Sequence, residues 1–401
     1  MSSPRRRGSS HFLDSRFCGN DNLYDQSPLR GVEKITLSHY RCYEHFSLAL
    51  DTRPVVMTGP NGAGKTNLLE AISFLIPGRG LRRARLADVR RQGSPDPWAI
   101  SVNLKEEGEG IHIGTGLDPE NPDSERRIVR INGEKAKSQS TLAEWVSIVW
   151  LTPQMDRLFL DGPQGRRQFL DRLVYGFDAA HAQRLNRYEK ALRERSLLLR
   201  QGRPDRYWLE GLEQTLVDEG IAITAARREV VGQLTSVLKT YEGPFPQADI
   251  FLEGDIEAAL REKTVLEVED QFRVRLAESR DQDRFSPRPL YGPHRSDLNV
   301  TFTEKNQKAA LCSTGEQKAL LLSIVMASAQ LLAVRTGAIP LLLLDEVVAH
   351  LDEARRSALF DAILRLKIQA WLTGTDPSLF KEMQGDAQFL SLEGARLVSI
   401  T

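Results

Sequence analysis

The sequence predicts an α/β fold in which a mixed sheet with flanking helices is assembled from both ends of the chain around an inserted helical domain. Short, uninterrupted apolar runs occur early and late in the 401 residues, at 55–58, 341–344 and 370–373. Such runs are typical of strands that are buried on both faces of a parallel sheet. Between them, apolar residues recur at helical spacing. We therefore expect strands from the two chain ends to share one sheet.

The structured part of the chain is expected to begin near Gly31. Apolar residues alternate with polar ones around residue 36 and again around residue 47, which predicts two strands. The apolar run at 55–58 ends in a glycine-rich turn, and residues 66–76 then have the apolar spacing of a helix.

The middle of the chain, from about residue 165 to 241, has the periodicity of amphipathic helices. Gly202, Pro204 and Asp205 interrupt this pattern, so we expect an antiparallel hairpin with arms of about 35 residues, roughly 50 Å each. This pattern fits a plain helical subdomain and a subdomain that binds a partner equally well. The predicted division is an N-terminal extension without order at 1–30, the N-terminal part of the head at 31–164, the helical insert at 165–285, and the C-terminal part of the head at 286–401.

The composition is that of a globular protein. Lys and Arg total 54, and Asp and Glu total 54, so any DNA binding requires a local basic patch. Cys18, Cys42 and Cys312 are too scattered for a zinc site or a disulfide framework, which favours a reducing, cytoplasmic location. The basic start at residues 5–7 lacks the apolar segment of a targeting peptide. We expect no membrane span, because the longest apolar candidate, residues 339–348, is short and carries acids.

Residues 59–66 read GPNGAGKT, a full match to the phosphate-binding loop G-x-x-x-x-G-K-[ST]. A strand precedes the loop and a helix follows it, as the motif requires. Its backbone amides form an anion nest, to which the helix start adds partial positive charge. Lys65 is expected to reach the β- and γ-phosphates of ATP, and the Thr66 hydroxyl to ligate Mg²⁺. The ATP-binding residues predicted here are Gly59, Pro60, Asn61, Gly62, Ala63, Gly64, Lys65, Thr66 and Asn67.

Two adjacent carboxylates, Asp345 and Glu346, follow the apolar run at 341–344. Buried acids at a strand end require an opposing charge, which nucleotide-bound Mg²⁺ supplies; a solvated pair is the alternative. Asp345 is expected to hold the ion through a water molecule. Glu346 is the predicted catalytic residue, a general base that polarises the attacking water.

A second half-site is predicted at residues 313–318, which read STGEQK before an apolar helix at 319–332. A serine at a helix N-cap presents backbone amides to an anion. The string resembles the signature of ABC ATPases, usually LSGGQ, but departs from it at Cys312, Thr314 and Glu316. The resemblance implies an ABC-type P-loop ATPase head that contacts the γ-phosphate held by a second head. The residues assigned to this contact in trans are Ser313, Thr314, Gly315, Glu316 and Gln317.

Three single residues extend the resemblance to ABC heads, although each alone is equally typical of a surface loop. Gln154, after an apolar run at 148–151, matches the Q-loop residue that is implied to sense Mg²⁺ and the γ-phosphate. Asp352 matches the D-loop. Thr375 takes the place of the switch histidine of transporter heads, and it is implied to face the nucleotide. Because threonine cannot act as a cation, we expect slow turnover in which hydrolysis releases a clamp. The predicted Mg²⁺ residues are Thr66, Asp345 and Gln154.

Four strings together resemble the RecF family of SMC-like ATPases: NGAGKTNLLEAI, GPQGRRQFLD, YGPHRSDL and STGEQK, starting at residues 61, 162, 291 and 313. The second and third discriminate best. The resemblance, which extends from about residue 31 to the C-terminus, implies an ATP-dependent homodimer that binds duplex DNA and gap junctions. It also implies action with RecR and RecO to load RecA. An SMC-like clamp is disfavoured because Thr66 and Ser313 are only 313 − 66 = 247 residues apart. A transporter subunit is disfavoured by the long helical insert.

Residues 79–91 contain six arginines against one acid, a local charge of 6 − 1 = +5. Arginine suits phosphate contacts, and the lack of aromatic residues favours duplex backbone over single strands. A solvated basic face or internal ion pairs are the alternatives. The role of His294 and Arg295 is open between facing the nucleotide, joining the two halves of the head, and a buried, bonded pair. The DNA-binding candidates are Arg79, Arg82, Arg83, Arg85, Arg90 and Arg91.

Overall fold

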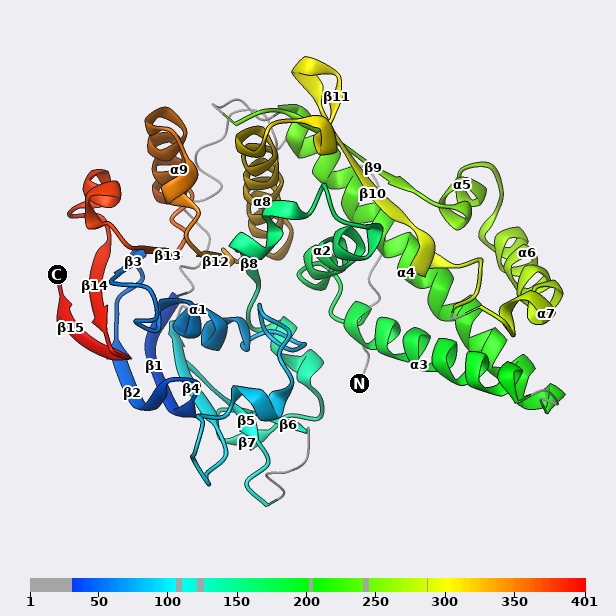
Figure 1. Ribbon diagram of the computed structural model, residues 1–401, viewed down its shortest axis with the longest axis horizontal. Coiled ribbons are helices and arrows are strands. Elements are labelled where there is room, and N and C mark those ends of the chain that lie inside the picture. The colour runs from blue at the N-terminus through cyan, green and yellow to red at the C-terminus, as the bar shows by residue number, and fades with distance from the viewer. Residues whose placement is uncertain (1–30, 106–109, 121–125, 202–204, 241–244, 287) are drawn as a thin grey trace, which may run out of the picture.

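Three sheets organise the protein in the computed structural model (Figure 1). The expected extension at 1–30, and Gly202 and Pro204 of the expected hairpin turn, lie outside the described residues. The structure describes residues 31–401 apart from 106–109, 121–125, 202–204, 241–244 and 287.

The central sheet joins strands from both ends of the chain, as predicted. Its neighbouring strands are parallel except at one edge, where β15 runs antiparallel to β14. The apolar runs predicted as strands at 55–58, 148–151 and 341–344 match three of its strands residue for residue, and all of their residues are buried. In sheet order, the strands are β15 (Arg396–Ile400), β14 (Gln388–Glu393), β3 (Val55–Thr58), β13 (Ala370–Gly374), β12 (Leu341–Leu344) and β8 (Ile148–Leu151).

The second sheet is antiparallel and comes from the N-terminal part of the chain alone. The helix α1 (Lys65–Ser73) lies between it and the central sheet (Figure 1), and seven of the nine helical residues are buried. It ends earlier than the predicted 66–76, because Phe74 caps it and donates its amide to the Ala71 carbonyl. In sheet order, the strands are β2 (Tyr43–Ala49), β1 (Gly31–Tyr40), β4 (Ala99–Lys105), β5 (Ile111–Leu117), β6 (Arg127–Ile131) and β7 (Glu134–Lys135).

The opposite face of the central sheet is covered by α8 (Thr314–Thr336) and α9 (Glu353–Arg365) (Figure 1). Among the helices in the described ranges, α8 alone is long and apolar enough to cross a membrane, which corrects the expectation that no such stretch exists. However, 78% of its apolar window is buried inside the protein, and it packs against β8 and the long helix α4 (Arg206–Thr240). Burial of this kind is typical of a core helix.

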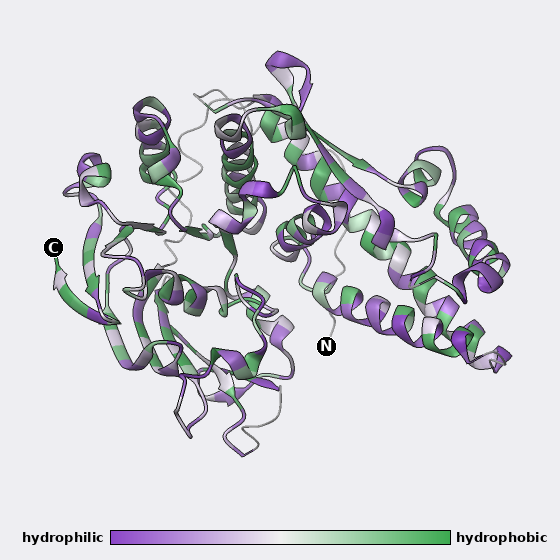
Figure 2. Ribbon diagram, in the orientation of Figure 1, coloured by the Kyte–Doolittle hydropathy of each residue, from purple (hydrophilic) through white to green (hydrophobic). Residues whose placement is uncertain are grey.

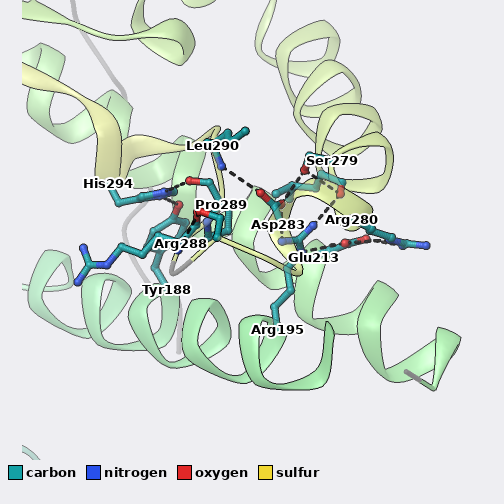
Figure 3. A network of polar contacts seen from close by, with 12 residues as sticks. Tyr188, Arg195, Glu213, Ser279, Arg280, Asp283, Arg288, Pro289, Leu290 and His294 are labelled. Carbon is teal, nitrogen blue, oxygen red and sulfur yellow. Dashed lines mark hydrogen bonds and ion pairs between the residues drawn. The ribbon is translucent and has the colours of Figure 1, made fainter. Parts of the chain in front are cut away.

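The insert contains the predicted antiparallel hairpin, formed by α3 and α4, but only α4 has the predicted 35 residues. The expectation of two equal arms is wrong because the chain turns between α2 and α3, where the Asp178 side chain accepts from the Ala180 amide. Arg195 of α3 pairs with Glu213 of α4 and with Asp283 (Figure 3). Figure 2 shows hydrophilic residues alternating with hydrophobic ones along α3, as expected for a helix with one exposed face. The helices are α2 (Pro163–Tyr175), α3 (His181–Arg200), α4 (Arg206–Thr240), α5 (Asp255–Glu262), α6 (Val265–Glu278) and α7 (Arg280–Asp283).

A third sheet connects the insert to the C-terminal part of the chain. Its strand β9 (Ala248–Glu253) lies within residues expected to be helical, and it pairs antiparallel with β10 (Asp297–Phe302), which also pairs with β11 (Gln307–Lys308). Side chains of β9 are alternately buried and exposed, a strand signal that the sequence reasoning missed. One sheet therefore crosses the boundary at 285/286, and the division of the chain there stays a prediction.

Candidate nucleotide-binding site

The predicted phosphate loop connects β3 to α1, and its glycines have the backbone angles that the turn requires. Gly59, Gly62 and Gly64 have φ values of +147°, +83° and +106°. A Cβ atom on Gly59 would lie 2.1 Å from the Leu392 carbonyl oxygen, and one on Gly64 would lie 2.4 Å from the Tyr43 hydroxyl. Gly64 is also the N-cap of α1, so no side chain caps the first-turn amides of that helix. These amides can therefore donate hydrogen bonds to a bound anion.

Lys65 is held over this loop. Its Nζ atom donates to the carbonyl oxygens of Gly59 at 2.6 Å and Pro60 at 3.0 Å. Burial lowers the pKa of Lys65, and the carboxylates of Glu346 and Asp345 partly offset that effect. The ammonium group therefore lies between the loop and the acidic strand end.

The acidic strand end meets the loop through a cluster of oxygen atoms. Asp345 Oδ1 accepts from Thr66 Oγ1 at 3.0 Å and from Thr373 Oγ1 at 2.8 Å. Burial raises the pKa of Asp345, and the two hydroxyl donors lower it in part. Glu346 has a φ of +55°, and its amide donates to Thr373 Oγ1 at 2.9 Å. Residues from both ends of the chain thus form one site.

These groups fit the predicted ATP and Mg²⁺. Mg²⁺ prefers oxygen ligands, and the Thr66 hydroxyl and the Asp345 carboxylate present oxygen atoms 3.0 Å apart. The uncapped amides of α1 and the Lys65 ammonium suit negatively charged phosphates.

Thr373 is a site residue that the sequence reasoning missed. It lies in an otherwise apolar strand, and its importance follows from register, because Leu344 pairs with Leu372 and the next residues are therefore neighbours. Thr375, the predicted counterpart of the switch histidine, is exposed beyond the end of β13. The hydroxyl that contacts the two acids is that of Thr373.

The signature residues form the N-terminus of α8, as predicted. Ser313 is the N-cap, and a reciprocal capping box joins it to Glu316. The Glu316 carboxylate also pairs with Lys305, and this hydrogen bond, with those from Ser313, lowers the pKa of Glu316 to about 2. The Gln317 side chain donates to the Cys312 carbonyl at 2.8 Å. In the described part of the chain, no hydrogen bond or ion pair joins residues 313–317 to the phosphate loop of the same chain.

The other two predicted loop residues lie on short turns beside the central sheet. Gln154 is exposed in the 3-10 turn Pro153–Arg157, which follows β8 directly. Asp352 is the N-cap of α9 and accepts from the Arg355 amide at 2.8 Å. Its observed contacts are those of a helix cap.

Side chains of the arginine-rich segment differ in their exposure, and some of them contact acidic residues. Arg82 donates to Asn67 Oδ1 at 2.7 Å and lies 3.6 Å from the buried Glu70 carboxylate, so it braces α1. Arg91 pairs with Glu44 at 3.4 Å. The internal ion pairs that were an alternative for this segment therefore exist at two of its arginines. Arg90 is partly buried, and the remaining arginines are exposed: Arg79, Arg83 and Arg85.

His294 and Arg295 lie in the 3-10 turn Pro293–Arg295, next to helix α3 of the insert. His294 accepts from the Tyr188 hydroxyl at Nδ1 (2.7 Å), and its Nε2 atom donates to the Pro289 carbonyl at 2.8 Å. Burial lowers the pKa of His294 to about 4, so the neutral ring is favoured. Arg295 is exposed. His294 is thus half-buried and hydrogen-bonded at both ring nitrogens, whereas Arg295 does not share its burial.

A parallel sheet that brings a phosphate loop from one chain end to an acidic strand end from the other defines an ATPase head of the ABC and SMC class. The family model described as RecF/RecN/SMC N terminal domain matches residues 31–393. The chain belongs to the RecF family of DNA replication and repair proteins. It is 48% identical over 364 residues to RecF of Mesorhizobium japonicum, covering 90% of this chain and 96% of that protein. It is 45% identical over 372 residues to RecF of Brucella suis, covering 92% and 96%.

Solved structures share this fold. The recombination mediator protein RecF of the RecFOR pathway, as RecF-ATPrS, superposes with a TM-score of 0.81 at 22% identity, covering 93% of this chain and 98% of that one. The RecF-ATP structure gives 0.79 at 21% identity, covering 93% and 100%. An Smc head domain from Pyrococcus furiosus gives 0.51 at 16%, covering 93% and 96%. The predicted ATPase head with a helical insert is confirmed.

Proposed function

We propose that this chain is a cytoplasmic, ATP-dependent recombination mediator that recognises gapped DNA. With RecR and RecO, it would promote RecA loading in recombinational repair, replication-fork maintenance and the SOS response. The observation that carries the proposal is the meeting of Lys65 and Thr66 with Asp345 and Glu346 in one site. Family membership supports the DNA repair role, and the RecFOR pathway of the solved RecF structures supports the partners.

The residues have separate roles in this proposal. Lys65 and the loop amides bind the phosphates of ATP, and the Thr66 and Asp345 oxygens hold Mg²⁺ together with Gln154. Bound Mg²⁺ neutralises charge that develops on the transferred phosphoryl group. Glu346 accepts a proton from the attacking water. Turnover is slow, because no cation takes the place of the switch histidine at Thr375.

The signature residues act on a second copy of the chain. The described side-chain hydrogen bonds and ion pairs of residues 313–317 are with one another, Cys312 and Lys305 rather than with the phosphate loop, which supports a role in trans. Two ATP molecules would then be enclosed between two heads. Asp352 would lie at the same interface.

Light scattering with and without Mg²⁺-ATP tests this arrangement. We expect the wild type to be monomeric alone and dimeric with ATP. Lys65→Met removes the phosphate contact, and Ser313→Arg places a bulky side chain at the signature, so both variants should stay monomeric. Ser313→Ala is the matched control for loss of the helix cap, which costs about 1 kcal/mol of stability. Wild-type protein that remains monomeric with ATP and gapped DNA would contradict the proposal.

The DNA contact is proposed to involve the exposed arginines of residues 79–91. Arg79→Ala with Arg83→Ala should weaken duplex binding and reduce its salt dependence by about one unit of slope per lost phosphate contact. Arg396→Ala, an exposed arginine on β15, is the control. Fluorescence anisotropy at several salt concentrations measures both quantities. Unchanged affinity of the double variant for duplex DNA would show that DNA binds at another surface.

A further inference from the structure

The two strings that best distinguish this sequence from other ABC heads come together around a pocket in the insert. The pocket has a volume of about 380 Å³ and lies between α2, α3 and α4. The string at 162–171 contributes Gln164, Arg167 and Asp171, and the string at 291–298 contributes Pro293 and His294. The nucleotide site uses neither string.

One part of the pocket wall is held in place by hydrogen bonds among its own residues. Arg227 donates to both Asp171 carboxylate oxygens, at 2.7 and 2.8 Å, and to the Pro293 carbonyl at 2.7 Å. His294 is bonded to Tyr188, as Figure 3 shows. The charges of Arg227 and Asp171 therefore neutralise each other, and these residues fix the shape of the pocket rather than its charge.

The rest of the lining carries an excess of positive charge. Five arginines and two carboxylates line the pocket, a balance of 5 − 2 = +3. Arg193 lies 3.8 Å from Glu189, which leaves Arg167, Arg200 and Arg288 as the unbalanced cations. Burial is the main cause that lowers the pKa of Arg167, and Asp297 and Asp171 partly offset the added effect of Arg227.

Two of these cations are open to a ligand. Arg200 and Arg288 are exposed, and the guanidinium group of neither forms an ion pair or a hydrogen bond with any residue in the described ranges; the Arg288 backbone bonds to the Ser286 hydroxyl. In Figure 3, the Arg288 side chain extends away from the polar network around Arg195.

Part of the pocket lining is apolar. It includes Leu185, Leu192 and Ile223, and also Leu197, which is 60% exposed. A phosphate group alone would gain nothing from contact with these apolar side chains. A single-stranded base would need an exposed aromatic face, whereas the Tyr188 ring beside the pocket is 2% exposed and bonded. A DNA duplex is too wide to enter a cavity of this volume.

We propose that this pocket is a docking site for an acidic peptide segment of a partner protein. An apolar or aromatic side chain of the peptide enters between Leu185, Leu192 and Ile223. Flanking carboxylates pair with the guanidinium groups of Arg167, Arg200 and Arg288, which suit bidentate contacts. The unpaired amides of peptide backbone can bond to Gln164 and Gln168 at the rim.

The test uses a fluorescein-labelled pool of eight-residue peptides made of Asp, Glu, Leu and Phe, and a matched pool with Asn and Gln as the polar residues. We expect anisotropy to show binding of the acidic pool only, weakened by salt. Arg200→Ala with Arg288→Ala should weaken it about tenfold, the effect of losing roughly 1.4 kcal/mol. Leu197→Ser should weaken it less. Arg206→Ala, an exposed arginine of the same hairpin outside the pocket, should have no effect.

Further measurements separate this site from the proposed ATP function. Lys65→Met protein should bind the acidic pool as the wild type does, and the double arginine variant should still dimerise with ATP, which also verifies its fold. Equal binding of both pools, or equal affinity in the double variant, would overturn the proposal. So would an oligo-dT strand that binds more tightly than the peptides and is released by the same two substitutions.

Discussion

At the candidate nucleotide site, one hydroxyl group positions both acidic residues. Thr373 Oγ1 donates to Asp345 Oδ1 at 2.8 Å and accepts from the Glu346 amide at 2.9 Å. The left-handed backbone of Glu346 costs a non-glycine residue about 1 kcal/mol, which the hydrogen bond to its amide helps to offset. The orientation of the proposed general base therefore depends on a residue of the neighbouring strand.

Thr373→Val keeps the side-chain shape and removes both hydrogen bonds. We expect ATP hydrolysis to fall about tenfold or more, because a hydrogen bond to a charged group contributes about 1.5–3 kcal/mol. ATP binding should change less, since Lys65 and the loop amides remain. Steady-state phosphate release and nucleotide binding measure the two effects. Thr375→Val, an exposed position, is the matched control, and a larger loss in that variant would contradict this assignment.

The half-buried, hydrogen-bonded ring of His294 predicts a pH dependence of stability. Its pKa is about 4 in the folded protein and about 6.5, the ordinary value, in the unfolded chain, so the unfolded chain binds more protons between these values. Stability is therefore lost as the pH falls from about 6.5 toward 4, by on the order of 2 kcal/mol at pH 5. Urea unfolding at pH 7.5 and pH 5 should show a smaller difference for His294→Gln, which cannot titrate. Equal losses of stability in the wild type and in His294→Gln would show that His294 does not cause the pH dependence.

At the scale of single residues, sequence motifs indicated which residues belong to the site better than they indicated which residues those contact. The phosphate loop and the acid pair were recognisable because their chemistry requires adjacent residues. Thr373 was missed because its contact depends on strand register. Arg82 was grouped with DNA-binding candidates because a run of arginines does not reveal that the buried Glu70 lies within reach of one of them.

Among the elements, the phosphate loop has the strictest backbone requirements. Gly59→Ala would place a Cβ atom 2.1 Å from a backbone oxygen at a φ of +147°, and we expect it to cost on the order of 3 kcal/mol of stability. Gly62→Ala meets no atom within 4 Å and should cost about 1 kcal/mol for its φ of +83° alone. Urea unfolding of the pair measures the difference. Equal losses would show that the loop shifts to accommodate a side chain at residue 59.

Three strands buried along their whole length, β3, β8 and β12, were predictable to the residue, because each forms a continuous apolar run between turns; β13 extends one residue beyond its predicted run. The hairpin arms were less predictable, since the turn between α2 and α3 keeps helical spacing on both sides. Gly176, at the end of α2, packs so closely on α8 that a Cβ atom would lie 2.7 Å from Leu332 Cδ2. Local sequence patterns do not reveal this contact between α2 and α8. The strand β9 had a local signal, but it was short and surrounded by helices.

Over the whole molecule, α4 links the insert to the head. Leu212, Leu216 and Ile223 belong to the core of the insert, whereas Val230 and Leu234 of the same helix belong to the core of the head. Glu229 of α4 pairs with Arg335 in the last turn of α8, at the opposite end of that helix from the signature. The helix α4 therefore contributes to both cores and is tied to the C-terminal end of α8.

The proposed dimer encloses each ATP between the loop of one copy and the signature of the other, which predicts complementation. Lys65→Met protein retains an intact signature, and Ser313→Arg protein retains an intact phosphate loop. Each variant alone should neither dimerise with ATP nor hydrolyse it. In an equimolar mixture, however, a mixed dimer contains one site with a good loop and a good signature.

We therefore expect ATP hydrolysis to reappear on mixing, at up to about one half of the wild-type rate. Because neither variant dimerises with itself, every dimer in the mixture is mixed, and each mixed dimer has one functional site of two. Phosphate release at constant total protein measures this, and analytical ultracentrifugation with ATP detects the mixed dimer. A Lys65→Met, Ser313→Arg double variant mixed with either single variant is the control: with Lys65→Met no dimer has an intact loop, and with Ser313→Arg none has an intact signature. Activity of either single variant alone, or none in the mixture at concentrations where the wild type dimerises, would show that each ATP is bound and hydrolysed within one copy of the chain.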